Sequence, residues 1–172
     1  MATRHHSVAG ERIYELLVAG DDVNVSKISL TNTQKVSKCK VDLYIEMELT
    51  GKFYLLKGVE LPIGATLIYD DIKFSNNTGH FGLYIKLTDG ATFTLTGSID
   101  PTGTNTNVPG TNTLYTSELS IGDEIVVSGE TRVISNITSD TAAVVSAAWG
   151  SDLANDTTPD CNPTALVDVI IN

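Results

Sequence analysis

The chain has 172 residues, which is enough to fill one sizeable hydrophobic core or two small ones. Lys and Arg number 11 against 21 Asp and Glu, and the resulting net charge of −10 repels phosphate backbones and anionic lipid surfaces, so neither nucleic acid nor a membrane is an expected partner. Only 19% of the residues are charged, and the abundance of Ser and Thr favours strands and turns.

Alternation of apolar and polar residues predicts seven short strands in the first half of the chain. In residues 41–45, for example, Val, Leu and Ile point to one side while Asp and Tyr point to the other. Gly, Asp and Asn separate the strands, and Thr88-Asp89-Gly90 has the composition of a tight hairpin turn between the last two. We therefore predict an antiparallel β-sandwich over residues 1–96. The predicted strands cover residues 12–18, 23–31, 41–45, 52–56, 65–69, 81–87 and 91–96.

Residues 97–114 are rich in Thr, Asn, Gly and Pro and poor in apolar side chains, which predicts a linker or long loop. Alternation resumes in residues 121–127, 131–138, 142–147 and 165–171, so residues 115–172 are expected to form a second, small β-barrel-like module. The whole chain is thus predicted to be all-β.

Motifs that carry chemistry are missing from the sequence: it has no nucleophile elbow, phosphate-binding loop, dinucleotide fingerprint, zinc helix or calcium loop. We assign no catalytic, cofactor-binding or metal-binding residue and predict a protein that is not an enzyme. His80 could act as a base or ligand but is better explained as a solvated turn residue. His5 and His6 could bind a metal as a pair, but a flexible tail is the preferred interpretation.

Three pairs of adjacent acids could supply oxygen ligands to calcium, although acids on turns are usually solvated: Asp21-Asp22, Asp70-Asp71 and Asp123-Glu124. The acids at 152, 156 and 160 recur every four residues, but the prolines at 159 and 163 disfavour a helix there. Cys39 and Cys161 have no metal-ligand spacing, so two reduced thiols are expected and a disulfide stays an alternative. No cofactor is predicted.

Aromatic residues concentrate in the first predicted module, where packing in the core explains most of them and stacking on sugars is the alternative: Tyr44, Phe53, Tyr54, Tyr69, Phe74, Phe81, Tyr84 and Phe93. Trp149 is expected to fill the second module, with an interface anchor as the alternative. Residues 1–10 lack the apolar run of a signal peptide and no later run reaches membrane-spanning length, which predicts synthesis in a cytosol.

Two stretches of the sequence combine turns and core positions in patterns typical of small β modules. In the first, residues 23–30, 41–45 and 53–56 precede LPIGATL (61–67), and the later LTDGATF (87–93) fits the same β-sandwich module. In the second, LSIGDEI (119–125), GETRVI (129–134) and ITSDT (137–141) resemble small SH3-like β-barrels. Both stretches resemble modules of the structural proteins of tailed-bacteriophage virions. The resemblance implies a virion structural protein, made in the host cytoplasm, that decorates the capsid or attaches to the neck or tail. Other virion proteins are its expected partners, in a homo-oligomer or lattice.

Two other functions are weighed against this one. A carbohydrate- or receptor-binding module is suggested by the aromatic residues and the Asn/Asp-rich loops. A hydrolase of cell-wall sugar would need two carboxylates across a cleft, and no pair stands out. Unprotected strand edges are expected in residues 92–95, 125–127 and 167–171, where Lys, Arg and Pro are missing. The run 165–171 is apolar on both faces and must be covered, by its own module or by a strand from a neighbouring chain.

Overall fold

A computed structural model of the chain describes residues 3–47, 51–75, 81–103 and 105–172, and divides the chain into two compact units. The first, which we call the sandwich unit, comprises Met1–Gln34, Lys38–Asp89 and Ala165–Asn172. The second, which we call the inserted unit, comprises Lys35–Ser37 and Gly90–Thr164. Along the chain, the inserted unit therefore interrupts the sandwich unit between residues 89 and 165.

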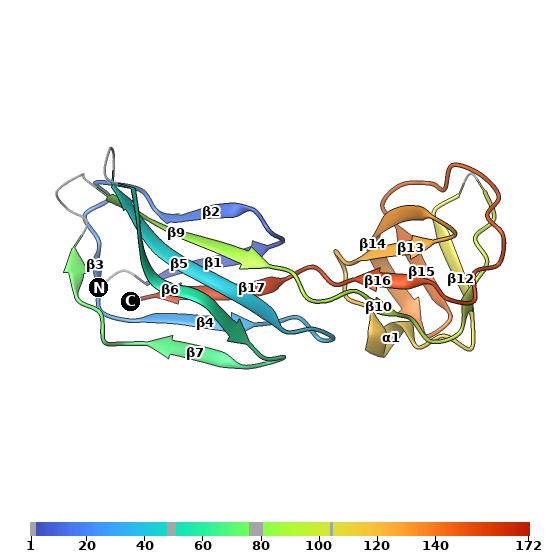
Figure 1. The fold of residues 1–172 in the computed structure, drawn as a ribbon, viewed down its shortest axis with the longest axis horizontal. Helices are drawn as coiled ribbons and strands as arrows, with labels where there is room; N and C mark the ends of the chain where they lie inside the picture. The colour runs from blue at the N-terminus through green and yellow to red at the C-terminus, as the bar shows by residue number, and fades with distance from the viewer. Residues whose placement is uncertain (1–2, 48–50, 76–80, 104) are drawn as a thin grey trace. The chain divides into compact units, whose positions relative to one another are not determined.

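Two four-stranded antiparallel sheets form the sandwich unit (Figure 1). The first sheet has the order β1 (Arg4–Ala9), β17 (Leu166–Ile171), β4 (Ile28–Asn32) and β7 (Thr66–Tyr69). The second has the order β2 (Ile13–Leu17), β9 (Phe81–Thr88), β5 (Cys39–Met47) and β6 (Gly51–Leu61). A separate two-stranded ribbon joins β3 (Asn24–Val25) to β8 (Phe74–Ser75).

Apolar side chains from both sheets meet in a single core between the layers. Leu30 and Val169 contribute from the first sheet, and Leu43 and Ile85 from the second; all four side chains are fully buried. The alternation that predicted the strands is the cause, because a period of two sends every second side chain of a strand to the inner face.

The inserted unit is built on one sheet with the order β10 (Phe93–Thr94), β16 (Asp160–Asn162), β13 (Glu124–Val127), β14 (Glu130–Ser139), β15 (Ala142–Val145), β12 (Asn107–Thr111) and β11 (Ser98–Ile99). Its helix α1 (Tyr115–Glu118) is a single turn. Trp149, Ile125 and Tyr115 lie in its separate core. The all-β, antiparallel prediction is confirmed. The expected barrel is not found: within the described residues, β10 and β11 each pair with one neighbour and leave the sheet open.

The structure draws the boundaries between the units differently from the sequence-based division into residues 1–96, 97–114 and 115–172. The segment expected to be a linker contains β11 and β12, and its Ile99 and Val108 are fully buried in the core of the inserted unit. Two buried apolar side chains, together with the pairing of β11 with β12 and of β12 with β15, hold a segment whose composition is otherwise that of a loop.

The expected hairpin at Thr88-Asp89-Gly90 is wrong. β9 pairs with β2 and β5, whereas β10 pairs with β16 in the other unit. The Asp89 carboxylate instead accepts a hydrogen bond from the backbone N–H of Ala165, at 2.7 Å, where the chain re-enters the sandwich unit. An Asp-Gly pair thus marks the point at which the chain leaves one unit for the other.

Two of the three runs expected to be exposed edges are interior strands. The run 165–171 supplies β17, which pairs with β1 on one side and β4 on the other, so its backbone groups are bonded within the chain. Its inner face is buried, whereas Leu166 and Ile170 on the outer face are partly exposed. Residues 125–127 lie in β13, between β14 and β16. The alternative prediction, that this run pairs with a strand of a neighbouring chain, is therefore wrong. Of the three runs, only residues 92–95 contain an edge strand, β10.

Candidate interaction surfaces

Three tyrosines form a row across the outer face of the second sheet. Tyr84 on β9 and Tyr54 on β6 both pair with Tyr44 on β5, which lies between them. The ring centroids of Tyr44 and Tyr84 are 5.6 Å apart with an interplanar angle of 18°, and those of Tyr44 and Tyr54 are 5.5 Å apart. Tyr44 is only 1% exposed, although it lies outside the core between the sheets. We call these three residues the tyrosine row.

Charged side chains cover the rings of the tyrosine row. The Lys52 ammonium lies 4.5 Å from the centroid of the Tyr44 ring and donates a hydrogen bond to the Tyr44 hydroxyl, while Lys57 lies 4.6 Å from the centroid of the Tyr54 ring. Such cation–π contacts stabilise the rings where they stand. Because the faces of Tyr44 contact Tyr84 and Lys52, that ring presents no open platform on which a sugar could stack.

Tyr84 completes the row with a hydrogen bond from its hydroxyl to Glu15 Oε1, at 2.9 Å. Burial, together with this bond, raises the pKa of Tyr84 to about 12. Gly82 leaves room for the ring, since a Cβ there would lie 2.9 Å from Tyr84 Cε2. The row is thus a packed, internally bonded layer.

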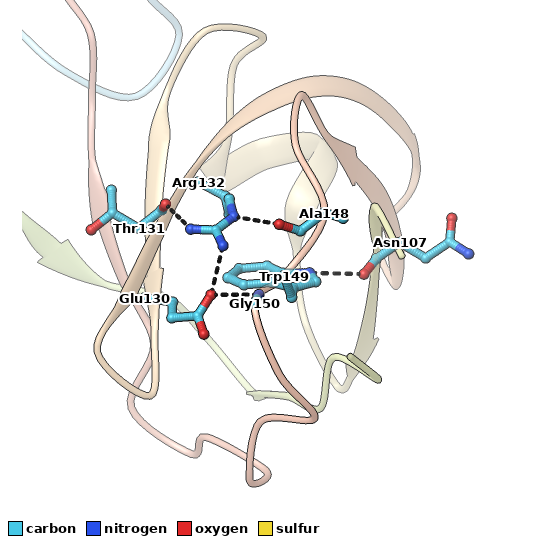
Figure 2. A network of polar contacts seen from close by, with 7 residues as sticks. All are labelled: Asn107, Glu130, Thr131, Arg132, Ala148, Trp149 and Gly150. Atoms are coloured by element: carbon cyan, nitrogen blue, oxygen red, sulfur yellow. Dashed lines mark hydrogen bonds and ion pairs between the residues drawn. The ribbon is translucent and has the colours of Figure 1, made fainter. Parts of the chain in front are cut away.

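In the inserted unit, an arginine holds the segment that carries the single tryptophan (Figure 2). Arg132 donates from Nε to the carbonyl of Ala148 at 2.9 Å and pairs through Nη2 with Glu130 at 2.7 Å. Glu130 also accepts from the backbone N–H of Gly150. The guanidinium lies 5.4 Å from the centroid of the Trp149 ring. Arg132 and Glu130 together clamp residues 148–150.

Trp149 is 2% exposed, and its indole N–H donates to the carbonyl of Asn107 at 3.2 Å (Figure 2). The side chain packs with Val127 and Val145 in the core of the inserted unit. Trp149 therefore fills the core of its unit, as the preferred interpretation of the sequence expected. A ring so deeply buried offers no anchor to a partner.

Acidic residues in the inserted unit act mainly as hydrogen-bond acceptors for loops. Residues 90–164 contain nine Asp and Glu and a single cation, Arg132, so they carry −8 of the total charge of −10. A carboxylate that accepts from backbone N–H groups satisfies donors that a turn leaves unpaired. Six of the nine do so: Glu118 (from Thr96), Asp123 (from Ser120 and Thr164), Glu130 (from Gly150), Asp140 (from Thr116), Asp152 (from Gly103) and Asp156 (from Ser128 and Thr158).

The acid pairs proposed from sequence do not make a metal centre. Asp123 is fully buried, whereas Glu124, the first residue of β13, is exposed, so the two carboxylates do not share one site. Asp21 forms an ion pair with Arg4. Within the described residues, no group of three or more His, Cys, Asp or Glu is positioned to hold a metal ion.

The histidines of the expected flexible tail are ordered in strand β1. His5 points outward and is exposed, whereas His6 points inward and meets the Tyr14 ring edge-on at 6.0 Å between centroids. Its Nε2 is buried without a hydrogen-bond partner. Burial lowers the pKa of His6, and the positive charge of nearby Arg4 lowers it further. A backbone hydrogen bond with Leu16 raises the pKa, but by less than burial lowers it. The third histidine, His80, lies outside the described residues.

Acidification is expected to destabilise the sandwich unit through His6. Its pKa is 6.5 in an ordinary environment and lower when folded, so between these values the unfolded chain binds a proton that the folded chain does not. This contribution to stability is complete above pH 6.5 and declines as the pH falls below it. Urea unfolding at about pH 7.5 and about pH 5 should show a smaller pH-dependent loss in His6→Gln than in the wild type or His5→Gln. An equal loss in all three chains would contradict the prediction.

A depression of about 310 Å³ lies on the outer face of the first sheet, beside His5, Ser7 and Asp168. These residue types could suggest a hydrolytic triad. In such a triad, however, the imidazole stands between the acid and the hydroxyl. Here the Ser7 hydroxyl donates directly to the Asp168 carboxylate. The contact therefore ties β1 to β17 and does not activate the serine.

Cys39 and Cys161 are both buried free thiols, and each lies in a different unit. Burial, with a smaller effect of Asp89, raises the pKa of Cys39 to about 11. Burial, with Asp123 nearby, also raises that of Cys161. Because the thiolate is the reactive form, neither thiol is primed for chemistry.

Both thiols are expected to resist modification in the folded protein. Incubation with a disulfide reagent at about pH 8 should label neither cysteine within minutes, whereas the same reaction in denaturant should label two per chain. Fast labelling of one native thiol would show that its unit opens readily. Mass spectrometry of tryptic peptides identifies which cysteine has reacted.

Comparison with known proteins gives no family. No family model and no curated protein matches the chain. Its only helix in the described ranges, α1, is far too short and polar to cross a membrane. Among solved structures, a chain of infectious bursal disease virus, Gx strain, is similar with a TM-score of 0.27 and 11% identity over 99% of this chain. A chain from the T13 viral particle of the same virus gives 0.27 and 7%, over 98%.

The present chain spans only 32% and 38% of the lengths of those two viral chains. TM-scores this low do not establish a common fold.

Proposed function

We propose that the chain is a non-enzymatic structural component of a virus particle that acts through protein–protein contacts. The resemblance of its turn and core patterns to tailed-phage proteins supports a peripheral position, as a capsid decoration or a protein attached to the neck or tail. Its partners would then be other virion proteins, and its place the virion, after synthesis in the host cytoplasm.

The observation that carries the proposal is the internal use of polar side chains. Carboxylates hold the loops of the inserted unit, Arg132 clamps residues 148–150, and the tyrosine row packs upon itself. Segments tied down in this way open rarely, which suits a component that must keep its shape on a particle. Catalysis instead requires acids, bases or nucleophiles that are free to meet a substrate.

Mass spectrometry of purified particles of the virus that encodes the chain tests the proposal. The protein should remain at a fixed ratio to the major capsid protein after density-gradient purification. Its presence in infected lysate but loss from every particle fraction would refute a virion role. Particles stripped of heads or tails would then locate it within the virion.

A carbohydrate- or receptor-binding function is the second candidate, favoured by two aromatic side chains on edge strand β6. Phe53 is 50% exposed and Tyr54 is 43% exposed. A glycan array would detect binding, and loss of binding in Phe53→Ala would place it at this edge. Because Lys57 covers the Tyr54 ring, only Phe53 offers a largely open aromatic surface there.

A further inference from the structure

Within the described residues, the two four-stranded sheets of the sandwich unit have four edge strands, and three of these carry features that block pairing with another chain. Charged side chains and bulges are the usual protection of an edge. β1 carries Arg4, β2 carries Glu15 and a register shift, and β6 carries Lys52 and Lys57 together with two register shifts. β7, the remaining edge, reads Thr-Leu-Ile-Tyr and has neither a charge nor a proline nor a bulge.

The backbone of β7 offers hydrogen-bonding groups on its free side. In an antiparallel ladder, residues direct their N–H and C=O groups to alternate sides. The backbone N–H of Asn32 donates to the carbonyl of Ala65, at 3.0 Å. This bond shows which residues of β7 direct their backbone groups toward β4. It follows that Leu67 and Tyr69 bond to β4, whereas Thr66 and Ile68 direct their N–H and C=O groups outward. In the described part of the chain, no strand pairs with β7 on that side.

We propose that two copies of this chain pair through β7, antiparallel and about a two-fold axis at Leu67. Thr66 of one copy would lie opposite Ile68 of the second, and the reverse, giving four backbone hydrogen bonds and one continuous eight-stranded sheet. Antiparallel pairing of identical strands is self-complementary, as a two-fold interface requires. The inference deepens the proposed function and rests on it, since it names the contact by which a virion component would associate with itself.

Side chains and charges suit this pairing. Ile68 is 51% exposed and would lie beside Thr66 of the second copy on the outer face of the sheet. In the same register, Asp70 and Asp71 fall opposite Gly64 and Ile63 of the second copy, so the acids of the two copies do not face each other. Each copy nevertheless carries a net charge of −10, so added salt should strengthen the association.

Sedimentation equilibrium of the full chain from about 1 µM to about 1 mM tests the pairing, because contacts of this small size are weak. The wild type should dimerise with rising concentration, and more strongly in salt. Ile68→Lys should weaken the dimer at least about tenfold by guarding the edge. Thr66→Pro should do the same, since it removes an outward N–H and leaves the ladder with β4 intact. Ile13→Lys on β2, where the isoleucine is equally exposed at 53%, is the matched control and should dimerise normally.

A monomer at every concentration, or a dimer weakened equally by Ile13→Lys, would overturn the pairing. Hydrogen exchange adds a readout independent of mass, because the amides of Thr66 and Ile68 should become protected as the concentration rises. Particle analysis separates the two proposals. A monomeric chain found in purified particles refutes the β7 pairing alone, whereas a β7 dimer missing from particles refutes the virion role and leaves the pairing standing.

Discussion

Replacing Tyr44 with alanine is expected to lower the unfolding free energy of the sandwich unit by about 3–5 kcal/mol, the range for loss of a fully buried aromatic ring. Tyr44 is 1% exposed and contacts rings from two neighbouring strands, so its removal leaves a hole in the outer layer of the sheet. The Lys52 ammonium would also lose the ring and the hydroxyl that it contacts. Urea unfolding followed by far-ultraviolet circular dichroism measures the loss.

Tyr54→Ala is the matched control for that experiment. Tyr54 is 43% exposed and lies at one end of the row, where it contacts one ring of the row, that of Tyr44, so its loss should cost about 1 kcal/mol, the value of one aromatic pair. Tyr44→Phe should cost about as little, because only the bond from Lys52 is lost. Equal costs for Tyr44→Ala and Tyr54→Ala would contradict the packing described for the row.

Asp123→Ala is expected to destabilise the inserted unit by about 2–4 kcal/mol. The carboxylate of Asp123 is fully buried and accepts from the backbone N–H groups of Ser120, at 2.7 Å, and Thr164, at 2.9 Å. Each donor left unsatisfied away from water costs about 1–3 kcal/mol. Asp123→Asn should lose less, because its amide oxygen can still accept from one of the two donors.

Trp149 is the single tryptophan of the chain, and its place in the core of the inserted unit makes its fluorescence a specific probe of that unit. Glu124→Ala is the control, since Glu124 is the adjacent acid but is exposed, and it should shift the unfolding free energy by at most about 0.5 kcal/mol. A loss of that size for Asp123→Ala would mean that the two N–H groups find other acceptors.

Strand positions were predictable from sequence because they depend on a local pattern. The alternation in residues 41–45 places Val41 and Leu43 on the inner face of β5, as the structure shows. The same pattern gives the correct outer face to Tyr44 but not its burial. Tyr44 is buried by Tyr54 and Tyr84, which lie on the two neighbouring strands. The alternation within one strand does not indicate which other strands pair with it.

The division into units was not predictable in the same way. β17 follows the strands of the inserted unit in sequence but pairs with β1 and β4. The sequence of residues 166–171 does not predict which strands it pairs with. The acids of the inserted unit show a similar limit. Their count is visible in the sequence, whereas their role as acceptors depends on which N–H groups the fold brings near them.

The place of β17 in the middle of a sheet has a consequence for the order of events during synthesis. During translation, β1 and β4 are synthesised early, and β17 only after every residue of the inserted unit. The inserted unit can therefore fold while the position of β17 between β1 and β4, here called the slot, is still empty. Closing that slot joins segments that are distant in sequence, which makes it a slow, late step. Until it closes, the edges of both strands are open to capture by another nascent chain.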